Sequence, residues 1–320
     1  MFQSRPLVPS ALGLPRRVGA RHSLRAIWQQ HWLLYVMLLP ALVLLALFNY
    51  YPLWGLALAF VDYNPFGGLA GSPFVGLQNF ATIFGGQEFW QILRNTVWIA
   101  TGKIVAGQVA AIVLALLVYE ITWRFYRRVL QTLTTLPYFL SWIIIGGVMV
   151  QVLSTTGTVD QALAAMGIRP IQFLGDAAIF PWTMIALDTW KGFGFGAVIY
   201  LAALTNINPD LYEAAAVDGA GRKARLWHIT LPGITPTIVL MSCLSLGSVL
   251  NAGFEQILVL YNPVVYQTGD ILDTYVYRYG ILQANYSIAT TVGLLKSVAG
   301  FFLILLSYWL ADRFAGYRIF

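Results

Sequence analysis

Three lysines lie inside long apolar runs of the chain, at Lys103, Lys191 and Lys296. A charged side chain in such a run is costly and usually functional, because a lysine at the centre of a bilayer costs about 2.5–3.5 kcal/mol. Asp188 and Glu255 are the only clear acidic candidates in the long apolar runs of the chain. At least one lysine is therefore expected to face a wet cavity and to bind an anionic group there. The alternative is that the lysines serve helix packing or contact a second subunit.

Aromatic and polar side chains also lie in the long apolar runs of the chain. The aromatic candidates for stacking on a ring-shaped ligand are Tyr138, Trp142, Trp190 and Phe193, and the candidates for hydrogen bonds to hydroxyl groups are Asn251 and Glu255. Aromatic walls with a few polar anchors suit a sugar. A purely structural interpretation is also open, because Asp188 and Lys191 are three residues apart and can pair on one helix face.

The elements that carry these residues are expected to be membrane-spanning helices. The chain of 320 residues is 58% hydrophobic and only 10% charged, whereas soluble domains carry about 25% charged residues. Six segments are long and apolar enough to cross a hydrocarbon core of about 30 Å. They are Trp32–Phe60, Leu93–Val118, Val129–Leu153, Phe180–Leu204, Gly233–Leu260 and Ile288–Leu310. The sequence therefore predicts an all-α integral membrane protein with six transmembrane helices.

The basic residues predict the orientation of these helices. Cytoplasmic loops of membrane proteins carry an excess of lysine and arginine. Here the basic residues outside the spans gather in the N-terminal tail, after the second and fourth spans and in the C-terminal tail, at Arg5, Arg16, Arg17, Arg21, Arg25, Arg124, Arg127, Arg128, Arg222, Lys223, Arg225, Arg313 and Arg318. The opposite loops hold Arg169 and Arg278, with Arg94 at a boundary. Both termini are expected in the cytoplasm, with residues 1–31 as a basic tail, 32–310 as the membrane domain and 311–320 as a second tail.

The segment of residues 208–232 reads as two short helices that meet at a glycine turn. Asn208 can cap a helix and Pro209 suits its first turn. Gly219 can take the left-handed conformation that ends this helix. A second short helix is expected to follow and to end at Pro232. From local physics alone, the segment can be an amphipathic elbow that only connects two spans.

The spacing of residues in this segment resembles the EAA loop of binding-protein-dependent ABC permeases. The matching positions are Glu213, Ala214, Ala215, Asp218, Gly219, Ile229, Leu231 and Pro232. Other segments resemble the polysaccharide and oligosaccharide branch of that family, namely residues 51–55, 62–66, 200–204 and 273–278. Within this branch the chain is most similar to permease subunits of alginate importers.

The resemblance implies a type I importer fold and a coupling role for the loop. Glu213, Ala214, Ala215, Asp218 and Gly219 would belong to a coupling helix that docks on an ATP-hydrolysing subunit, where Glu213 would pair with a basic residue. The implied partners are a second permease, two ATP-binding subunits, a periplasmic solute-binding protein and a saccharide substrate. The implied location is the bacterial cytoplasmic membrane, among lipid. With the three intramembrane lysines, an anionic saccharide such as a uronate oligomer is expected.

Other classes of protein have less support in the sequence. The chain has no G-x-x-x-x-G-K-[ST] phosphate loop, so ATP and magnesium are expected on the partner subunits rather than here. Gly192 and Gly196 are expected to permit close helix packing. His22, His31 and His228 are scattered, so no catalytic residue and no metal site is assigned. Nucleic acid is not an expected partner. An ion-coupled secondary transporter or a channel remains the alternative, because intramembrane charges also line ion paths.

Overall fold

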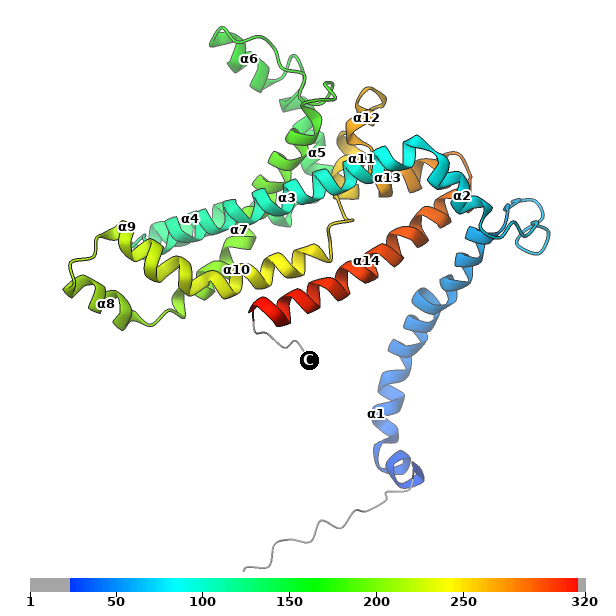
Figure 1. The fold of residues 1–320 in the computed structure, drawn as a ribbon, viewed down its shortest axis with the longest axis horizontal. Helices are drawn as coiled ribbons and strands as arrows, with labels where there is room; N and C mark the ends of the chain where they lie inside the picture. Colours follow the sequence, from blue (N-terminus) through cyan, green and yellow to red (C-terminus); the bar gives the residue numbers. More distant parts are fainter. Residues whose placement is uncertain (1–23, 316–320) are drawn as a thin grey trace, which may run out of the picture. The chain divides into compact units, whose positions relative to one another are not determined.

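The computed structural model describes residues 24–315, with side chains for residues 32–313. The described residues form helices and turns, and their only β-bridge is an isolated one between Val61 and Phe74. The chain divides into two compact units, residues 1–54 and residues 55–320. The predicted all-α class is therefore confirmed (Figure 1).

The first unit carries one long apolar helix. Helix α1 (Leu24–Leu45) contains Pro40 and continues into a π-helical turn, η1 (Ala46–Tyr50). A 3₁₀ segment, η2 (Tyr51–Phe60), then leads into the second unit. The stretch Trp32–Phe60 has a mean hydropathy of 2.2 and is long enough to cross a bilayer. It coincides with the first predicted span.

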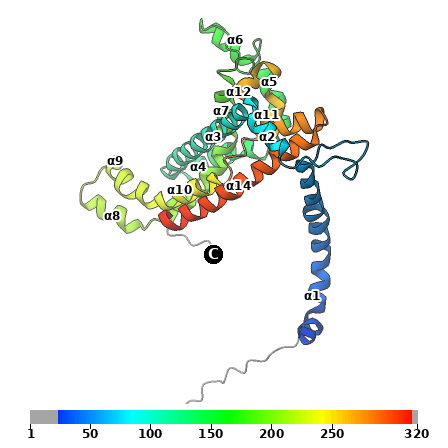
Figure 2. The same cartoon turned by 45° about the vertical axis from the view of Figure 1, so that its right-hand side comes forward.

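The second unit is a set of packed helices of very different lengths. They are α2 (Gln78–Gly85), α3 (Gln87–Tyr119), α4 (Arg124–Thr135), η3 (Leu136–Phe139), α5 (Trp142–Val152), α6 (Thr158–Ala165), α7 (Phe180–Thr205), α8 (Pro209–Val217), α9 (Arg222–Arg225), η4 (Leu226–Thr230), α10 (Leu231–Leu246), α11 (Phe254–Leu260), η5 (Pro263–Val265), α12 (Tyr266–Gly269), α13 (Leu272–Tyr277), η6 (Arg278–Leu282) and α14 (Tyr286–Ala315). Helix α3 packs along α7, and α10 packs along α14 (Figure 2). Segments 154–179 and 261–287, between the longer helices, contain α6 and η5 to η6 respectively.

Four helices within the described residues are long and apolar enough to cross a membrane. They are Trp32–Phe60, Gln87–Tyr119, Arg222–Leu246 and Tyr286–Arg313. Helix α7 has 26 residues, or about 39 Å at 1.5 Å per residue, but Asp188 and Lys191 lower its hydropathy. The predicted total of six spans and the cytoplasmic position of both termini stay predictions.

The third predicted span, Val129–Leu153, is not one straight helix. The chain bends by 99° between the stretches Arg124–Phe139 and Trp142–Val152, so this pair is a broken span or a re-entrant loop. Pro137 lies in the 3₁₀ segment η3 before the bend, where its missing N–H breaks the α-helical ladder. Ser141 then starts α5 by accepting a hydrogen bond from the backbone N–H of Ile144 at 3.4 Å.

The fifth span was predicted over Gly233–Leu260, and both of these bounds are wrong. The helix begins at Arg222 and passes through Pro232, because the π turn η4 carries the chain past the proline: the Leu231 N–H bonds to the Leu226 carbonyl. Pro232 therefore does not end a short helix. Helix α10 ends at Leu246, and residues 247–253 interrupt the span before α11. Gly253 permits this break with a φ of +88°.

Close helix packing occurs at Gly196 but not at Gly192. A Cβ at Gly196 would lie 3.1 Å from the Ala111 Cβ on α3, whereas one at Gly192 would meet nothing within 4 Å. The closest backbone approach is at Gly194, where a Cβ would lie 2.0 Å from the Thr134 carbonyl oxygen of α4. Gly194, rather than Gly192 or Gly196, is thus the glycine that lets α4 pack closely against α7.

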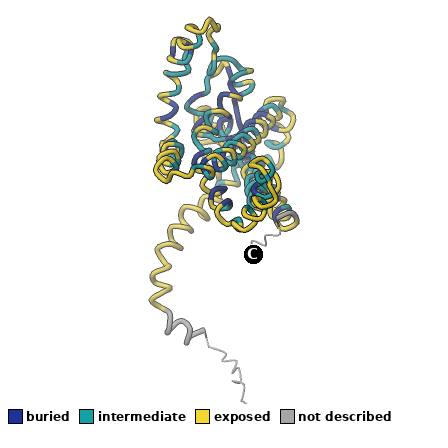
Figure 3. The backbone as a smooth tube through the Cα atoms, turned by 90° about the vertical axis from the view of Figure 1, so that its left-hand side faces the viewer, coloured by how far each residue is buried: buried dark blue, intermediate teal, exposed yellow. Residues whose placement is uncertain are grey.

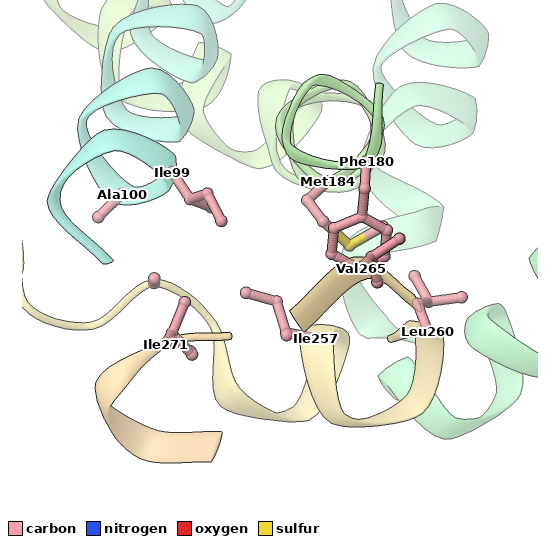
Figure 4. Packing of buried hydrophobic residues seen from close by; sticks show 9 residues of the cluster. Ile99, Ala100, Phe180, Met184, Ile257, Leu260, Val265 and Ile271 are labelled. Atoms are coloured by element: carbon pink, nitrogen blue, oxygen red, sulfur yellow. The ribbon is translucent and has the colours of Figure 1, made fainter. Parts of the chain in front are cut away.

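Figure 3 shows how burial varies along the backbone. The buried apolar residues of the second unit form three clusters: one where α3, α7 and the segments after α10 meet, one along α3, α7 and α10, and one among α2, α3, α13 and α14. One apolar cluster gathers around the break in the fifth span (Figure 4), and it consists of Ile99, Ala100, Phe180, Met184, Ala252, Ile257, Leu260, Val265 and Ile271. Phe180 is fully buried and is the largest side chain in this group. The cluster fixes α11 against α3 and α7 and so holds the interrupted backbone in place.

Candidate functional site: an elbow and an intramembrane polar region

The elbow of residues 208–232 has the predicted local structure up to its glycine turn, whereas its second predicted helix continues through Pro232. The Asn208 side chain accepts a hydrogen bond from the backbone N–H of Asp210 at 3.0 Å and caps α8. Gly219 turns the chain with a φ of +77°. Two further contacts hold the elbow: the Arg225 Nε donates to the Ala220 carbonyl at 2.8 Å, and the Tyr212 and Thr230 hydroxyls lie 3.0 Å apart. Helix α8 is therefore tied to the start of the long helix 222–246.

The outer surface of α8 combines an acidic residue with apolar side chains. Glu213, Ala214 and Asp218 are exposed, and Ala215 is partly buried. Leu211 and Val217 are 51% and 89% exposed. A cavity of about 820 Å³ adjoins α8, and Tyr119, Glu120, Tyr212, Glu213, Arg222 and Arg225 help to line it. Figures 1 and 2 place the elbow at the end of α10 remote from α11 to α13. Such an exposed surface suits a protein partner.

Lys191 belongs to α7, and its side chain lies beside the bend between α4 and α5, among aromatic side chains. Its Nζ donates to the Tyr138 carbonyl at 3.0 Å. It also lies 5.3 Å from the centre of the Tyr138 ring and 5.4 Å from that of Trp142, within cation–π range. The Tyr138 ring stacks on Phe195 of α7 at 4.2 Å. Three predicted residues thus come together here, with Phe195 as an unpredicted fourth.

Lys296 and Asn251 line a second region, a cavity of about 730 Å³ on the face of α14. The Lys296 Nζ forms an ion pair with Asp273 at 2.5 Å, and Asp273 lines the same cavity. Asn251 lies in the break of the fifth span and is exposed. The two predicted residues are therefore neighbours around one cavity, but the lysine already has an acidic partner.

Lys103 lies in a third region and is 7% exposed. Its Nζ donates to the Ala252 carbonyl at 2.6 Å and to the Gln256 Oε1. The Asp188 carboxylate lies 3.9 Å away. Asp188 therefore neighbours Lys103, and the alternative pair with Lys191, which the spacing allows, is not among the ion pairs of the described residues.

The other predicted path residues are less closely connected. Trp190 and Glu255 are exposed and Phe193 is partly buried. Within the described part of the chain, none of the three forms a hydrogen bond, ion pair or ring contact with another predicted path residue. The sequence reasoning missed Gln256, Asp273 and Phe195. Phe195 had a signal, since it lies four residues after Lys191 on one helix face, and Gln256 is a polar residue in an apolar run.

A fourth polar group surrounds Arg278, outside the spanning helices. Its guanidinium binds the carboxylates of Asp270 and, at 3.1 Å, Glu88. The rings of Tyr266, Tyr275 and Tyr279 surround it at 4.9 to 5.7 Å. Burial raises the pKa of the Asp270 carboxyl, while the hydrogen bond from Thr274 and the Arg278 charge act in the opposite direction. This group ties segment 266–279 to the start of α3.

Comparison with known proteins gives one consistent family. Residues 103–316 match the model of the binding-protein-dependent transport system inner membrane component. Protein LplB of Bacillus subtilis (strain 168) is 39% identical over 90% of this chain and 91% of its own length. The polygalacturonan/rhamnogalacturonan transport system permease protein YteP of the same organism is 38% identical over 88% of each chain.

Solved structures agree with these sequence relatives. A chain of a bacterial ABC transporter involved in the import of the acidic polysaccharide alginate aligns with a TM-score of 0.82 and 37% identity, over 91% of this chain and 99% of that one. A chain of a bacterial alginate ABC transporter, in complex with an alginate pentasaccharide-bound periplasmic protein, aligns with a TM-score of 0.83 and 36% identity. The predicted family is therefore confirmed, and the chain belongs to the inner membrane components of binding-protein-dependent transport systems.

Proposed function

We propose that this chain is the permease subunit of an ATP-driven importer that moves an acidic oligosaccharide or polysaccharide into the cytoplasm. One sequence relative is named for polygalacturonan and rhamnogalacturonan transport, and one structural relative imports alginate. Both names support a polymeric sugar, and the second supports an acidic one. A periplasmic binding protein delivers the saccharide, a second permease completes the passage, and two ATP-binding subunits supply the energy.

The observation that carries the acidic substrate is the environment of Lys191. Of the three intramembrane lysines, Lys103 and Lys296 have carboxylates within 4 Å, whereas no carboxylate of the described residues forms an ion pair with Lys191. Its one hydrogen bond goes to a neutral backbone carbonyl. A cation held among aromatic rings in a membrane has much to gain from a ligand carboxylate, because charge-assisted hydrogen bonds are worth about 1.5–3 kcal/mol. The same rings can stack on the sugar.

The elbow supports the coupling role. Glu213 and its apolar neighbours Leu211 and Val217 are exposed on α8, so a partner can dock without unfolding the elbow. Tyr212, through its contact with Thr230, ties α8 to the helix 222–246. Movement of a docked ATP-binding subunit would then pass directly into a membrane-spanning helix. Asp218 and Gly219 would shape the turn rather than touch ATP.

The test is ATP hydrolysis by the reconstituted importer, stimulated with binding protein loaded with a uronate oligomer or with a neutral oligosaccharide of equal length. We expect preference for the uronate oligomer. Lys191→Met should lower that stimulation about tenfold, which corresponds to the loss of one charge-assisted hydrogen bond. Lys191→Arg keeps the charge and is the matched control. Preference of the unmutated complex for the neutral sugar would refute the acidic substrate, and uptake without ATP would refute the importer.

A further inference from the structure

The break in the fifth span leaves backbone groups without helical partners inside an apolar region. Helix α10 ends at Leu246, and α11 starts only at Phe254. Non-helical backbone at membrane depth is tolerated only where protein groups or a wet cavity satisfy it. The Ala252 carbonyl at this break accepts its hydrogen bond from a side chain, the Lys103 Nζ of α3, at 2.6 Å. A lysine 149 positions away in the sequence therefore completes the backbone of the break.

Gln256 links the same lysine to a third helix. Its side chain is fully buried. Its Oε1 accepts from the Lys103 Nζ, and its Nε2 donates to the Met184 carbonyl of α7 at 2.9 Å. The Asp188 carboxylate of α7, 3.9 Å from the Lys103 Nζ, offsets the buried charge. Lys103 and Gln256 together join α3, α7 and the broken span at one point, which we call the Lys103 clamp.

The backbone at the break is shaped to accept this lysine. Gly253 has a φ of +88°, which residues with a side chain rarely adopt. A Cβ at Gly253 would also lie 2.7 Å from the Lys103 Nζ. The glycine therefore serves both the turn and the close approach of the ammonium group.

The residues on either side of the clamp line the 730 Å³ cavity, although the clamp itself does not. Asn251 precedes Ala252, and Phe254 follows Gly253; both line the cavity with Lys296 and Asp273. Lys103 is 7% exposed and has its acceptors within the protein. Its charge is therefore not free for a substrate carboxylate, but its position determines where the backbone of Asn251 lies.

We infer that Lys103 is a positioning residue for transport. It acts through the Ala252 carbonyl and Gln256 to hold Asn251 at the 730 Å³ cavity. This inference rests on the proposed function, because it assigns Asn251 to the saccharide path. The predicted role of Lys103 thus changes from binding a substrate carboxylate to fixing the backbone position of the break in the fifth span.

The test is a double-mutant cycle between Lys103 and Asn251, which have no hydrogen bond to each other. Uptake of a uronate oligomer into proteoliposomes that contain the complete importer would be measured. Asn251→Ala should lower uptake about fivefold in the unmutated background, the loss expected for one hydrogen bond. In the Lys103→Met background it should change uptake less than twofold, because Asn251 is already displaced.

The matched control is Gln108→Leu, which also removes contacts between α3 and the fifth span. Gln108 accepts from the Ser242 hydroxyl at 3.0 Å, on the helical part of that span rather than at its break. In this background Asn251→Ala should keep its full fivefold effect. If Lys103→Met does not assemble, Gln256→Met replaces it, because this change removes the other side of the clamp.

The outcomes separate the two proposals. If Asn251→Ala keeps its fivefold effect in the Lys103→Met or Gln256→Met background, the positioning role is wrong. The same holds if Asn251→Ala loses its effect in the Gln108→Leu background. If the unmutated importer does not take up the uronate oligomer, the proposed substrate fails. The cycle would then be repeated with the sugar that is transported, so the clamp is still tested.

Discussion

Arg278 shows what a single residue contributes outside the spanning helices. It binds Asp270, whose side chain is 3% exposed, and its own side chain is 17% exposed. The Asp270 carboxylate also accepts a hydrogen bond from the Thr274 hydroxyl at 2.6 Å. Removal of one partner from a buried ion pair typically costs about 3–5 kcal/mol, because the other charge stays buried and unpaired.

At this scale we predict that Arg278→Met destabilises the protein more at pH 8 than at pH 5. Burial raises the pKa of Asp270 above its unfolded value, and the substitution removes the opposing positive charge. The folded state then binds a proton more readily than the unfolded state, so its stability falls as the pH rises. The measurement is the thermal unfolding midpoint of the solubilised complex at both pH values. The double variant Asp270→Asn with Arg278→Met should lose this difference, and an equal midpoint of Arg278→Met at both values would contradict the prediction.

At the scale of elements, the contact between α4 and α7 depends on one glycine. We predict that Gly194→Ala lowers the unfolding midpoint, because its Cβ would lie 2.0 Å from the Thr134 carbonyl oxygen. Overpacking of this kind costs about 1–3 kcal/mol. Gly192→Ala, where nothing lies within 4 Å, is the matched control and should leave the midpoint unchanged or slightly raised. Equal midpoints for the two variants would show that α4 moves away without cost.

The elbow depends on a second glycine. Gly219→Val places a β-branched residue at a φ of +77°, a conformation that costs an L-residue about 1–2 kcal/mol. We expect this variant to lose most saccharide-stimulated ATP hydrolysis while the spanning helices remain folded. The control is Gly221→Val in the same turn, where φ is −71°. Normal stimulation in Gly219→Val, with the complex fully assembled, would show that the shape of this turn does not matter for coupling.

At the scale of the whole molecule, the open question is which ends of the helices face the cytoplasm. We predict that a cysteine at Arg222 is protected from an impermeant reagent added to spheroplasts, whereas one at Val264 reacts. Both positions are exposed, and the native Cys243 is buried and would be replaced by alanine. A cysteine at Asp270, in the same segment as Val264, would be unsuitable, because that position is buried and the reagent could not reach it. Labelling of position 222 from outside would overturn the predicted orientation.

Much of this protein follows from local sequence. The apolar runs predict the long helices α3 and α14 and the stretch Trp32–Phe60, because length and hydropathy are properties of the run itself. The elbow follows in the same way, since Asn208 and Gly219 act within a few residues of their own positions. The spacing around Glu213 was enough to indicate the family.

The tertiary structure alone decided how the intramembrane charges are used. Nothing near Lys103 in the sequence indicates that it binds Ala252 and Gln256, and nothing near Lys296 indicates its pair with Asp273. The bend before Trp142 and the break before Phe254 were likewise not apparent from hydropathy, because hydropathy is averaged over about 20 residues and does not show where the backbone leaves the helix. Local propensity acts over one or two turns of helix. The partner of a buried charge depends instead on which helices pack side by side, and only the folded chain determines that.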